Sequence, residues 1–441
     1  MKTIFVIFIC KLLKILGGLI GRGSSLPGQI ALKLDKNILQ NVQLPKNIVA
    51  VTGSNGKTST VEMISHILLK GNKSIAWNKE GSNQIEGVTT LILSNCTLLG
   101  KFKKDILLIE ADERYAKYIF KYVKPTYYVV TNLYRDQLTR NGHPLWVYNA
   151  IKESISEKSQ LILNADDPLV SMFGYGRDNN IWFGVDEFSG STKECTSIYN
   201  DGFYCPNCYN EMKYDYYHFA HIGSYHCDKC GHKKNNTNYT VTSVNLDKAE
   251  ICINNKNKIT LALNSLYNVY NILAAYSVTS ILGIDNEIIT DAINNYVLKN
   301  GRVINFKLNN HKGTLLTSKH ENSVSYDQSI NFAVNYKEDC SVIILVDAIS
   351  RKYFTSETSW LWDINFDKLI SKNIKSIFLS GAYANDLAVR FNYTDIPKDK
   401  IIINTDIDKT IKYLDSKGNE QLFVITCFSD KDKFINKVNI I

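Results

Sequence analysis

A lysine followed by two hydroxyl side chains lies in a turn with two glycines, within the sequence Thr52-Gly-Ser-Asn-Gly-Lys-Thr-Ser59. An apolar run at residues 48–51 precedes the turn, and a helical pattern of apolar residues follows it. A strand that turns into a helix in this way directs backbone N–H groups and the positive end of the helix dipole at one position, which suits phosphate. The pattern predicts a nucleotide site formed by Gly53, Asn55, Gly56, Lys57, Thr58 and Ser59.

Two side chains of this turn have expected roles. Lys57 is expected to reach the terminal phosphates of the nucleotide, and the Thr58 hydroxyl is expected to bind Mg²⁺. The first glycine of the usual P-loop is missing, so only Gly-x-x-Gly-Lys-Thr is present. The alternative is a glycine turn with a chance lysine, but the strand before it and the helix after it favour the nucleotide site.

Polar residues end three further apolar runs, at residues 106–110, 127–132 and 161–164. In a parallel sheet such strand ends mark the edge where ligands bind. The first run ends in Glu110, and Asp112 and Glu113 follow it. We expect Glu110 to be a catalytic residue and a Mg²⁺ ligand, because that ion prefers oxygen ligands. Asp112 and Glu113 fit helix caps or solvated acids at least as well.

Four cysteines form two Cys-x-x-Cys pairs, Cys205-Pro-Asn-Cys208 and Cys227-Asp-Lys-Cys230. Two such pairs supply four thiolates for tetrahedral Zn²⁺, and four thiolates leave no position for water, so this zinc is expected to be structural. Disulfides are the alternative. The other cysteines are scattered singly and no cleavable leader is evident, which favours a reducing cytoplasm and zinc.

A zinc ribbon also occurs in proteins that bind nucleic acid. The segment around these cysteines contains a few lysines and several tyrosines but no dense basic stripe, so we expect no nucleic-acid partner. The tyrosines fit the packing of a small ribbon better. A binding protein that keeps an inactive ATP fold is the corresponding alternative function.

The length of 441 residues predicts two or three domains, and the net charge of +8 is a mild excess of basic residues. The apolar start of the chain carries Lys11 and Lys14, which leaves no run long enough to span a membrane. Its periodicity fits an amphipathic helix. We expect this helix to pack on the protein, and contact with a membrane interface is the alternative.

The loop Thr52–Ser59 resembles the ATP loop of the Mur ligases, which form amide bonds in peptidoglycan synthesis. The stretches Thr131–Arg140 and Asn164-Ala-Asp-Asp-Pro168 are similar to those of the MurT group within this family. The MurT pattern also matches two further segments, Gly-Arg-Gly-Ser-Ser-Leu-Pro-Gly at 21–28 and Gly-Ser-Asn at 81–83. In MurT proteins a zinc ribbon is inserted in the ATP domain.

The resemblance implies an α/β fold with a Mur ligase-like P-loop central domain, an inserted four-cysteine zinc ribbon and a C-terminal Rossmann-like α/β domain. The expected boundaries are 1–45 for an N-terminal helical segment packed on the central domain, 46–303 for the central domain, 200–235 for the ribbon and 304–441 for the C-terminal domain. Strand and helix patterns alternate in both large segments, as this architecture requires.

Two further nucleotide contacts rest on the resemblance. It places Asn268 against the adenine, in a helix that starts at Leu266, and it makes Arg302 the arginine that touches the nucleotide. For Arg302, an ordinary surface arginine in a linker is an equally good interpretation of the sequence.

The resemblance also implies a partner, a glutaminase subunit of the class I glutamine amidotransferase type (GatD-like), which forms a heterodimer with the chain. In the family an acid of the C-terminal domain completes the catalytic triad of that partner. This chain departs from the family pattern at Lys319-His-Glu-Asn-Ser323 and at residues 353–358. Asp347 and Glu357 are therefore both candidates for the catalytic acid.

Together these features predict an ATP-dependent amide ligase that uses ATP, Mg²⁺ and Zn²⁺. The resemblance implies that it amidates the α-carboxylate of D-glutamate in the stem peptide of lipid II, by way of an acyl phosphate and ammonia from the glutaminase. The expected location is the cytoplasm, at the inner face of the plasma membrane where lipid II lies. A ligase with another acceptor, or one that uses free ammonia, is the alternative.

Overall fold

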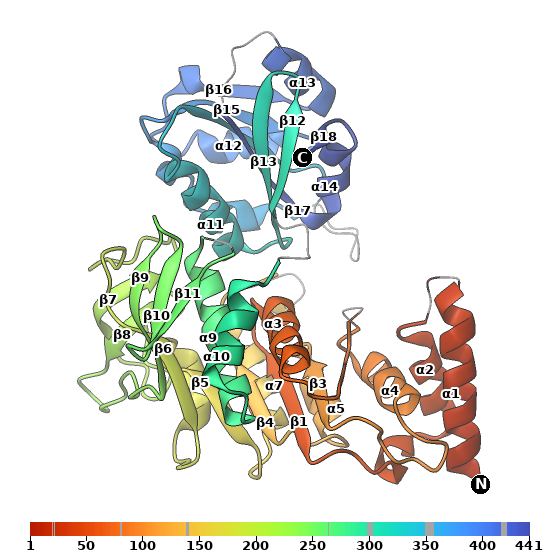
Figure 1. Ribbon diagram of the computed structural model, residues 1–441. Helices are drawn as coiled ribbons and strands as arrows, with labels where there is room; N and C mark the ends of the chain where they lie inside the picture. The colour runs from red at the N-terminus through yellow and green to blue at the C-terminus, as the bar shows by residue number, and fades with distance from the viewer. Residues whose placement is uncertain are drawn as a thin grey trace. The chain divides into compact units, whose positions relative to one another are not determined.

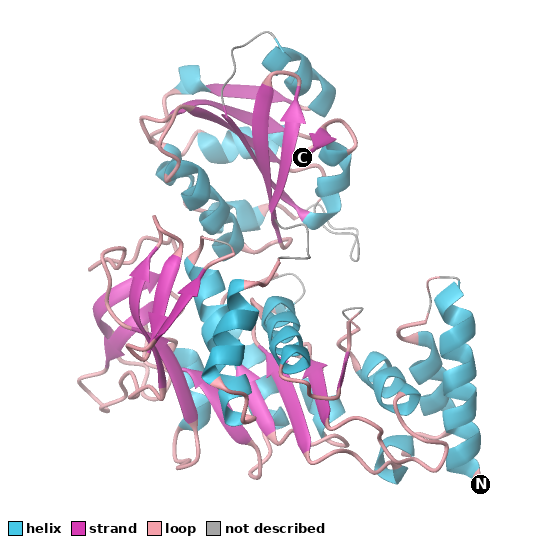
Figure 2. Ribbon diagram, in the orientation of Figure 1, coloured by secondary structure: helices cyan, strands magenta, loops and turns pink. Residues whose placement is uncertain are grey.

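The computed structural model describes residues 1–19, 21, 23–79, 82–137, 141–262, 264–297, 303–348, 357–415 and 421–441. The chain forms two compact units (Figure 1). Unit 1 comprises Met1–Tyr134, His143–Glu194 and Asp201–Val297, and unit 2 comprises Arg135–Gly142, Cys195–Asn200 and Leu298–Ile441. Each unit contains one large sheet with helices packed against it (Figure 2). The α/β fold predicted from the sequence is confirmed for the described residues.

The sheet of unit 1 has the order β11-β10-β9-β6-β5-β4-β1-β3-β2. All neighbouring strands from β2 to β9 run parallel, and β10 and β11 are added antiparallel at one edge. The strands are β1 (Asn47–Thr52), β2 (Ile75–Trp77), β3 (Ile106–Glu110), β4 (Tyr127–Val130), β5 (Gln160–Asn164), β6 (Ile181–Val185), β9 (Tyr239–Asn245), β10 (Glu250–Ile253) and β11 (Asn257–Thr260).

Helices cover the sheet of unit 1, and β3 is buried along its whole length, as expected for a parallel strand covered on both faces. The helices are α1 (Lys2–Leu19), α2 (Leu26–Leu34), α3 (Lys57–Lys70), α4 (Ile85–Ser94), α5 (Ala116–Phe120), α7 (Pro144–Ser154), α8 (Pro168–Ser171), α9 (Leu266–Ile281) and α10 (Asn286–Asn294), with the 3-10 turns η1 (Ile38–Asn41) and η2 (Met172–Gly174). Side chains of α1, α4, α5 and α7 share one apolar core with the central strands.

Helix α1 packs beside α2 and α4 at the β2 side of this unit (Figure 1). Its side chains Val6, Ile7 and Cys10 are fully buried in the core. This face of α1 therefore packs into the apolar core of unit 1. No helix of the described residues is both long enough and apolar enough to cross a membrane.

Between β6 and β9 the chain forms an insert around an antiparallel hairpin of β7 (Lys213–Phe219) and β8 (Ile222–His226). The four paired cysteines lie in turns on either side of this hairpin. Gly231, directly after the last cysteine, has a φ of +74°, a conformation that side chains with a Cβ disfavour.

Unit 2 contains a sheet with the order β16-β15-β14-β17-β13-β12-β18. The strands β13 to β17 are mutually parallel, and β12 pairs antiparallel with both of its neighbours. The strands are β12 (Val303–Leu308), β13 (His311–Ser318), β14 (Cys340–Leu345), β15 (Ile374–Ser380), β16 (Ile401–Asn404), β17 (Gln421–Cys427) and β18 (Asn439–Ile440). Its helices are α11 (Ser323–Val334), α12 (Ala384–Phe391), α13 (Ile407–Asp415) and α14 (Phe428–Ile435), with the 3-10 turns η3 (Ser359–Asp363), η4 (Phe366–Leu369) and η5 (Lys398–Lys400).

Two short segments that the sequence places in the central domain pack with unit 2 instead. In the first, Asp136 pairs with Lys319 and accepts a hydrogen bond from the Asn322 amide at 2.7 Å. In the second, the Thr196 carbonyl accepts a hydrogen bond from the Asn365 side chain at 3.0 Å. Hydrophobic periodicity could not reveal these polar contacts, because they join residues more than a hundred positions apart.

Candidate functional site

The turn between β1 and α3 has the backbone shape that its glycines predict. Gly53 and Gly56 have φ values of +132° and +82°, which favour glycine. A Cβ on Gly56 would lie only 2.1 Å from the Asn271 side-chain oxygen, so α9 approaches the turn closely. Helix α3 starts at Lys57, directly after Gly56, and its first N–H groups lie at the turn.

The segment that follows β4 holds this turn from the other side. The Ser54 N–H donates to the Asn132 carbonyl at 2.9 Å, and the Asn55 N–H donates to the Asn132 side-chain oxygen at 2.8 Å. The Thr131 hydroxyl donates to the Asn55 carbonyl at 2.8 Å. These contacts fix the turn at the carboxyl edge of the parallel sheet, the edge where ligands bind in such folds.

Lys57 lies in this turn and forms a buried ion pair. Its Nζ is 2.7 Å from Glu113 Oε2, and the two side chains are 10% and 3% exposed. The same ammonium donates to the backbone carbonyls of Gly53 and Ser54. Lys57 thus holds its ammonium at the first turn of α3, where an anion also benefits from the helix dipole, and Glu113 balances its charge.

Glu110, the last residue of β3, lies next to the start of α3 and is 4% exposed. Burial raises its pKa, while the nearby Lys57 and a hydrogen bond from the Thr58 hydroxyl oppose this increase. The Asn83 amide is 3.5 Å from Glu110 Oε1. The structure therefore brings the predicted Mg²⁺ ligands Thr58 and Glu110 together, and this set of oxygen atoms suits a hard divalent cation.

Asn268 lies in the first turn of α9 and is 5% exposed. Its N–H donates to the Ser265 carbonyl at 3.0 Å. The next turn of the helix carries Asn271, whose side-chain oxygen lies 3.4 Å from the Thr60 hydroxyl of α3. Arg302, the other contact expected from the resemblance, lies outside the described residues.

Two buried aspartates after β5 connect the sheet to the insert. Asp166 forms an ion pair with Lys234 at 2.7 Å and accepts a hydrogen bond from the Tyr270 hydroxyl at 2.6 Å. Asp167 accepts hydrogen bonds from the Leu133 N–H at 2.8 Å and from the first turn of α8, and it lies 3.5 Å from His221 Nε2. Both aspartates are completely buried, so their carboxylates are balanced by these contacts within unit 1.

The four cysteines of the insert form one cluster. The sulfur atoms of Cys205, Cys208, Cys227 and Cys230 all lie within 4.8 Å of one another. Two of the S–S distances, Cys205 to Cys230 and Cys208 to Cys227, are 3.5 Å. Four thiolates around a tetrahedral zinc lie roughly 3.8 Å apart. The geometry fits one zinc ion and excludes disulfides in this structure.

Asp347 follows β14 at the carboxyl edge of the parallel strands of unit 2. Its carboxylate accepts a hydrogen bond from the Ala382 N–H at 2.7 Å and pairs with Lys433. Burial tends to raise the pKa of Asp347, but the contacts with Lys433 and Ala382 outweigh it and lower the pKa. Glu357 lies just before η3, where its carboxylate accepts a hydrogen bond from the Ser359 N–H at 2.6 Å. The two candidate acids thus have different surroundings.

Comparison with known proteins agrees with this geometry. The Mur ligase middle domain family matches residues 51–279, and the MurT ligase C-terminal family matches residues 320–430. The MurT subunit of the glutamine-hydrolyzing lipid II isoglutaminyl synthase of Staphylococcus aureus (strain COL) is 34% identical over 400 residues, which cover 90% of this chain and 89% of that protein. The chain belongs to the MurT family of Mur ligases. It is thus an ATP-dependent ligase of peptidoglycan synthesis.

A second MurT relative and two solved structures extend this comparison. The corresponding subunit of Streptococcus pneumoniae is 30% identical and covers 93% of this chain and 91% of its own length. A pseudomurein peptide ligase from Methanothermus fervidus has a TM-score of 0.67 at 21% identity, covering 88% of this chain and 78% of its own. MurF from Acinetobacter baumannii has a TM-score of 0.64 at 15% identity, covering 93% of this chain and 80% of its own. The last two similarities show the fold alone.

In this MurT-family chain the sequence analysis missed one important acid. Glu113 fits a cap or a solvated acid by its position in the sequence, but the structure buries it to 2% exposure against Lys57. Its partner lies 56 positions earlier, so no local pattern could reveal the pair. Asn132 and Asn271 were also missed as residues that shape the turn.

The ion pair between Lys57 and Glu113 leads to a prediction about stability. Glu113→Gln should lower the free energy of unfolding by about 3 kcal/mol, because it leaves a buried ammonium without its partner. In the double variant with Lys57→Met both charges of the pair are removed, and about half of the loss should be recovered. Urea unfolding at neutral pH without nucleotide measures the free energy of unfolding of the wild type, the single variant and the double variant.

A surface ion pair in the same unit provides the matched control. Glu153 pairs with Lys117 at 2.8 Å, but its side chain is 61% exposed. Glu153→Gln should change the free energy of unfolding by less than about 1 kcal/mol. If Glu113→Gln proved no more harmful than this control, the buried pair would not be important for stability.

Proposed function

We propose that the chain is the ligase subunit of a lipid II isoglutaminyl synthase. It would convert the α-carboxylate of D-glutamate in the lipid II stem peptide to an amide, giving D-isoglutamine, at the inner face of the plasma membrane. One observation carries this proposal. A chain that matches MurT subunits over nine tenths of its length has a glycine turn at which Lys57, Thr58, Glu110 and Glu113 lie close together.

The reaction must overcome an acid–base problem, because a carboxylate and ammonia only form a salt at neutral pH. In the first step a carboxylate oxygen attacks the γ-phosphorus of ATP, which forms an acyl phosphate and releases ADP. In the second step ammonia attacks the acyl carbon, phosphate leaves, and the nitrogen loses a proton. Phosphoryl transfer of this kind depends mainly on positioning and charge neutralisation, which the residues of the turn can supply.

Each residue of the turn has a role in this scheme. The N–H groups at the start of α3 and the Lys57 ammonium would hold the phosphates, so the nucleotide competes with Glu113 for the lysine. Thr58 and Glu110 would hold Mg²⁺, which supplies positive charge next to the transferring group when bound. Asn268 would face the adenine, and Arg302 would contact the nucleotide.

The cysteine cluster would hold a structural zinc in a ribbon at residues 200–235. Support comes from the four sulfur atoms within 4.8 Å and from the small apolar core of the insert, which consists of Cys205, Met212, Tyr225 and Cys227. So small a core needs an additional crosslink to be stable. We also propose that residues 304–441 form a Rossmann-like domain, since its five central strands are parallel with helices between them.

Ammonia would come from a glutaminase partner of the GatD type that docks on this C-terminal domain. Asp347 is the better candidate for the acid that orients the partner's histidine. It stands at the carboxyl edge of the sheet with its carboxylate held by Lys433 and the Ala382 N–H, whereas Glu357 binds the backbone of its own 3-10 turn.

Lys57→Met tests the nucleotide site. The variant keeps most of the aliphatic side chain but loses the charge, so ATP turnover with lipid II and ammonium should fall by at least about a hundredfold. ADP release is the measurement, with circular dichroism to show that the protein is folded. Lys70→Met, at the exposed end of the same helix, is the control and should retain wild-type turnover. Retained activity in Lys57→Met would disprove the assignment of this turn.

Metal analysis tests the zinc ribbon. We expect one zinc per chain, and Cys205→Ser combined with Cys208→Ser should remove it and lower the melting temperature, because the binding free energy of such sites is folding free energy. Cys252→Ser, a single cysteine of β10, should leave the zinc content unchanged. A metal-free wild-type protein would contradict the proposal.

Asp347→Asn and Glu357→Gln, made separately and each combined with the partner, test the source of ammonia. Asp347→Asn should lose the reaction driven by glutamine but keep the one driven by ammonium, which bypasses the glutaminase. Glu357→Gln should keep both. If both variants kept full glutamine-dependent activity, or if no partner bound and ammonium alone sufficed, a ligase with free ammonia or another acceptor would explain the chain better.

A further inference from the structure

Helix α1 exposes an apolar stripe on the side that faces away from the core. Its exposed apolar side chains are spaced by one, three or four residues, which places them on one face of the helix. They are 39% to 81% exposed and comprise Ile4, Phe5, Phe8, Leu12, Ile15, Leu16 and Leu19. Apolar patches of this kind are rare on proteins that stay free in solution, so the stripe marks an interaction surface.

The turn after α4 also exposes apolar side chains close to α1. A Cβ on Gly100 would lie 3.9 Å from the side chain of Ile7, so the turn lies directly beside α1. Leu98 and Leu99 precede this glycine and are 44% and 83% exposed.

The charges around the stripe have one dominant sign. Helix α1 carries three lysines, Lys2, Lys11 and Lys14, and Lys2 lies 3.9 Å from the Asp35 carboxylate. Helix α1 itself has no acidic residue. Lys2 is exposed, and Lys11 and Lys14 lie at the border of the stripe, where both donate to Ser94. A basic border around an apolar helix face is typical of helices that lie in a membrane interface.

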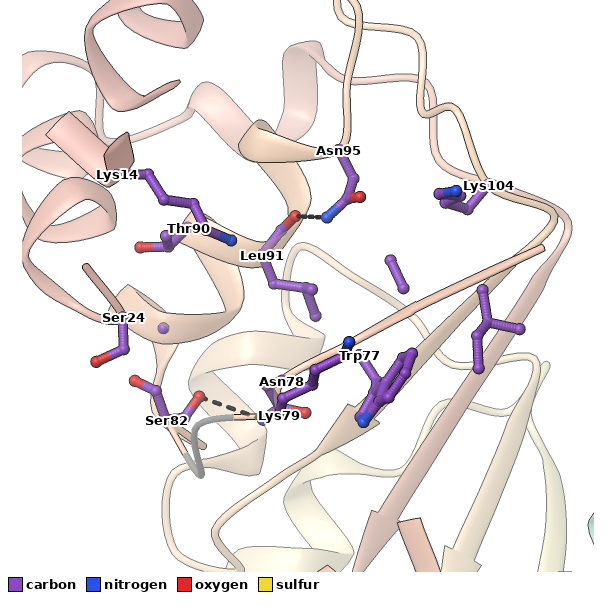
Figure 3. A pocket seen from close by; sticks show the side chains of 13 residues that line it. Lys14, Ser24, Trp77, Asn78, Lys79, Ser82, Thr90, Leu91, Asn95 and Lys104 are labelled. Carbon is purple, nitrogen blue, oxygen red and sulfur yellow. Dashed lines mark hydrogen bonds between the residues drawn. The ribbon is translucent and has the colours of Figure 1, made fainter. Parts of the chain in front are cut away.

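A cavity behind α1 is basic as well (Figure 3). It has a volume of about 380 Å³ and lies between α1, β2 and α4. Its lining includes Lys14, Lys79 and Lys104 and no acidic side chain among the residues described. Lys14 thus lies both at the border of the stripe and in the lining of this basic cavity.

We propose that the outward face of α1 docks on the surface of an anionic lipid membrane, with the helix lying in the plane of the headgroups. The proposal rests on the proposed function for one premise, a lipid-linked substrate. The inward face of α1 is fixed in the core of unit 1, so the helix would lie on the membrane rather than cross it. Two copies of this face packed together would oppose their lysines, which disfavours a dimer through the stripe.

Vesicle flotation of the purified full-length protein tests the docking. Wild-type protein should float with vesicles of phosphatidylcholine and phosphatidylglycerol, and more weakly with phosphatidylcholine alone. Phe8→Asp combined with Ile15→Asp should weaken binding by at least about tenfold, because it places two charges in the apolar face. Both side chains are exposed, so the fold should persist, and a melting curve checks this.

A matched control uses the exposed apolar pair Leu145 and Trp146 on α7 of the same unit. Leu145→Asp combined with Trp146→Asp should float like the wild type. If wild-type protein failed to float, or if both double variants lost binding equally, the docking surface would be wrong. The wild-type protein could instead form a dimer without binding vesicles. If Phe8→Asp combined with Ile15→Asp dissociated that dimer, the occupant of the stripe would be a second copy of the chain and the proposal would be overturned.

Amidation assays separate this proposal from the reaction on which it rests. The α1 variant should amidate a water-soluble, short-chain analogue of lipid II at the wild-type rate and lose activity only with lipid II in vesicles. If the wild type amidated neither substrate but still floated with anionic vesicles, the proposed reaction would fail and the docking would stand. If the variant amidated both substrates at the wild-type rate, docking would have no role in the reaction.

Discussion

The nucleotide turn depends on keeping one charged lysine in a site from which water is largely excluded. Removing an ammonium or a carboxylate from water costs several kcal/mol, and the structure offsets this by placing Glu113 2.7 Å from Lys57. Two backbone carbonyls accept the remaining protons of the ammonium. One of them belongs to Gly53, whose φ of +132° is accessible to glycine and strained for other residues. Gly53, Lys57 and Glu113 therefore depend on one another, because the conformation of the glycine and the carboxylate of the acid together hold the buried ammonium.

The insert depends on the sheet in a similar way. Its own apolar core contains only four buried side chains, too few to hold a domain together. Asp166 and Asp167 compensate from the end of β5, by binding Lys234, Tyr270 and the region of His221. Because both carboxylates are fully buried, changing either one would leave charged or polar partners unpaired. The Asn-Ala-Asp-Asp-Pro motif thus connects the sheet of unit 1 to the insert.

The sequence predicted what local patterns encode. The strand, glycine turn and helix around Lys57, the two Cys-x-x-Cys pairs and the alternating elements of both units are all short-range signals, and each appears in the structure. Glu113 and Asn271 were missed because their partners are distant in sequence. For the same reason the sequence placed residues 135–142 and 195–200 in the central domain, whereas polar contacts such as Asp136 with Lys319 attach them to unit 2. The exposed stripe of α1 was visible only as an amphipathic pattern, since exposure depends on how the chain packs.

The stretch from Thr131 to Gln137 shows how one motif can serve two cores. Its first residues hold the nucleotide turn, through the contacts of Thr131 and Asn132 with Asn55. Its later residues belong to unit 2, where Asp136 binds Lys319 and Asn322 and the Gln137 N–H donates to the Glu321 carbonyl. Lys319 and Asn322 lie in a segment that departs from the family pattern, yet both bind this motif. Asp136 therefore keeps a cation and an amide as partners although the sequence around Lys319 and Asn322 differs from the family pattern.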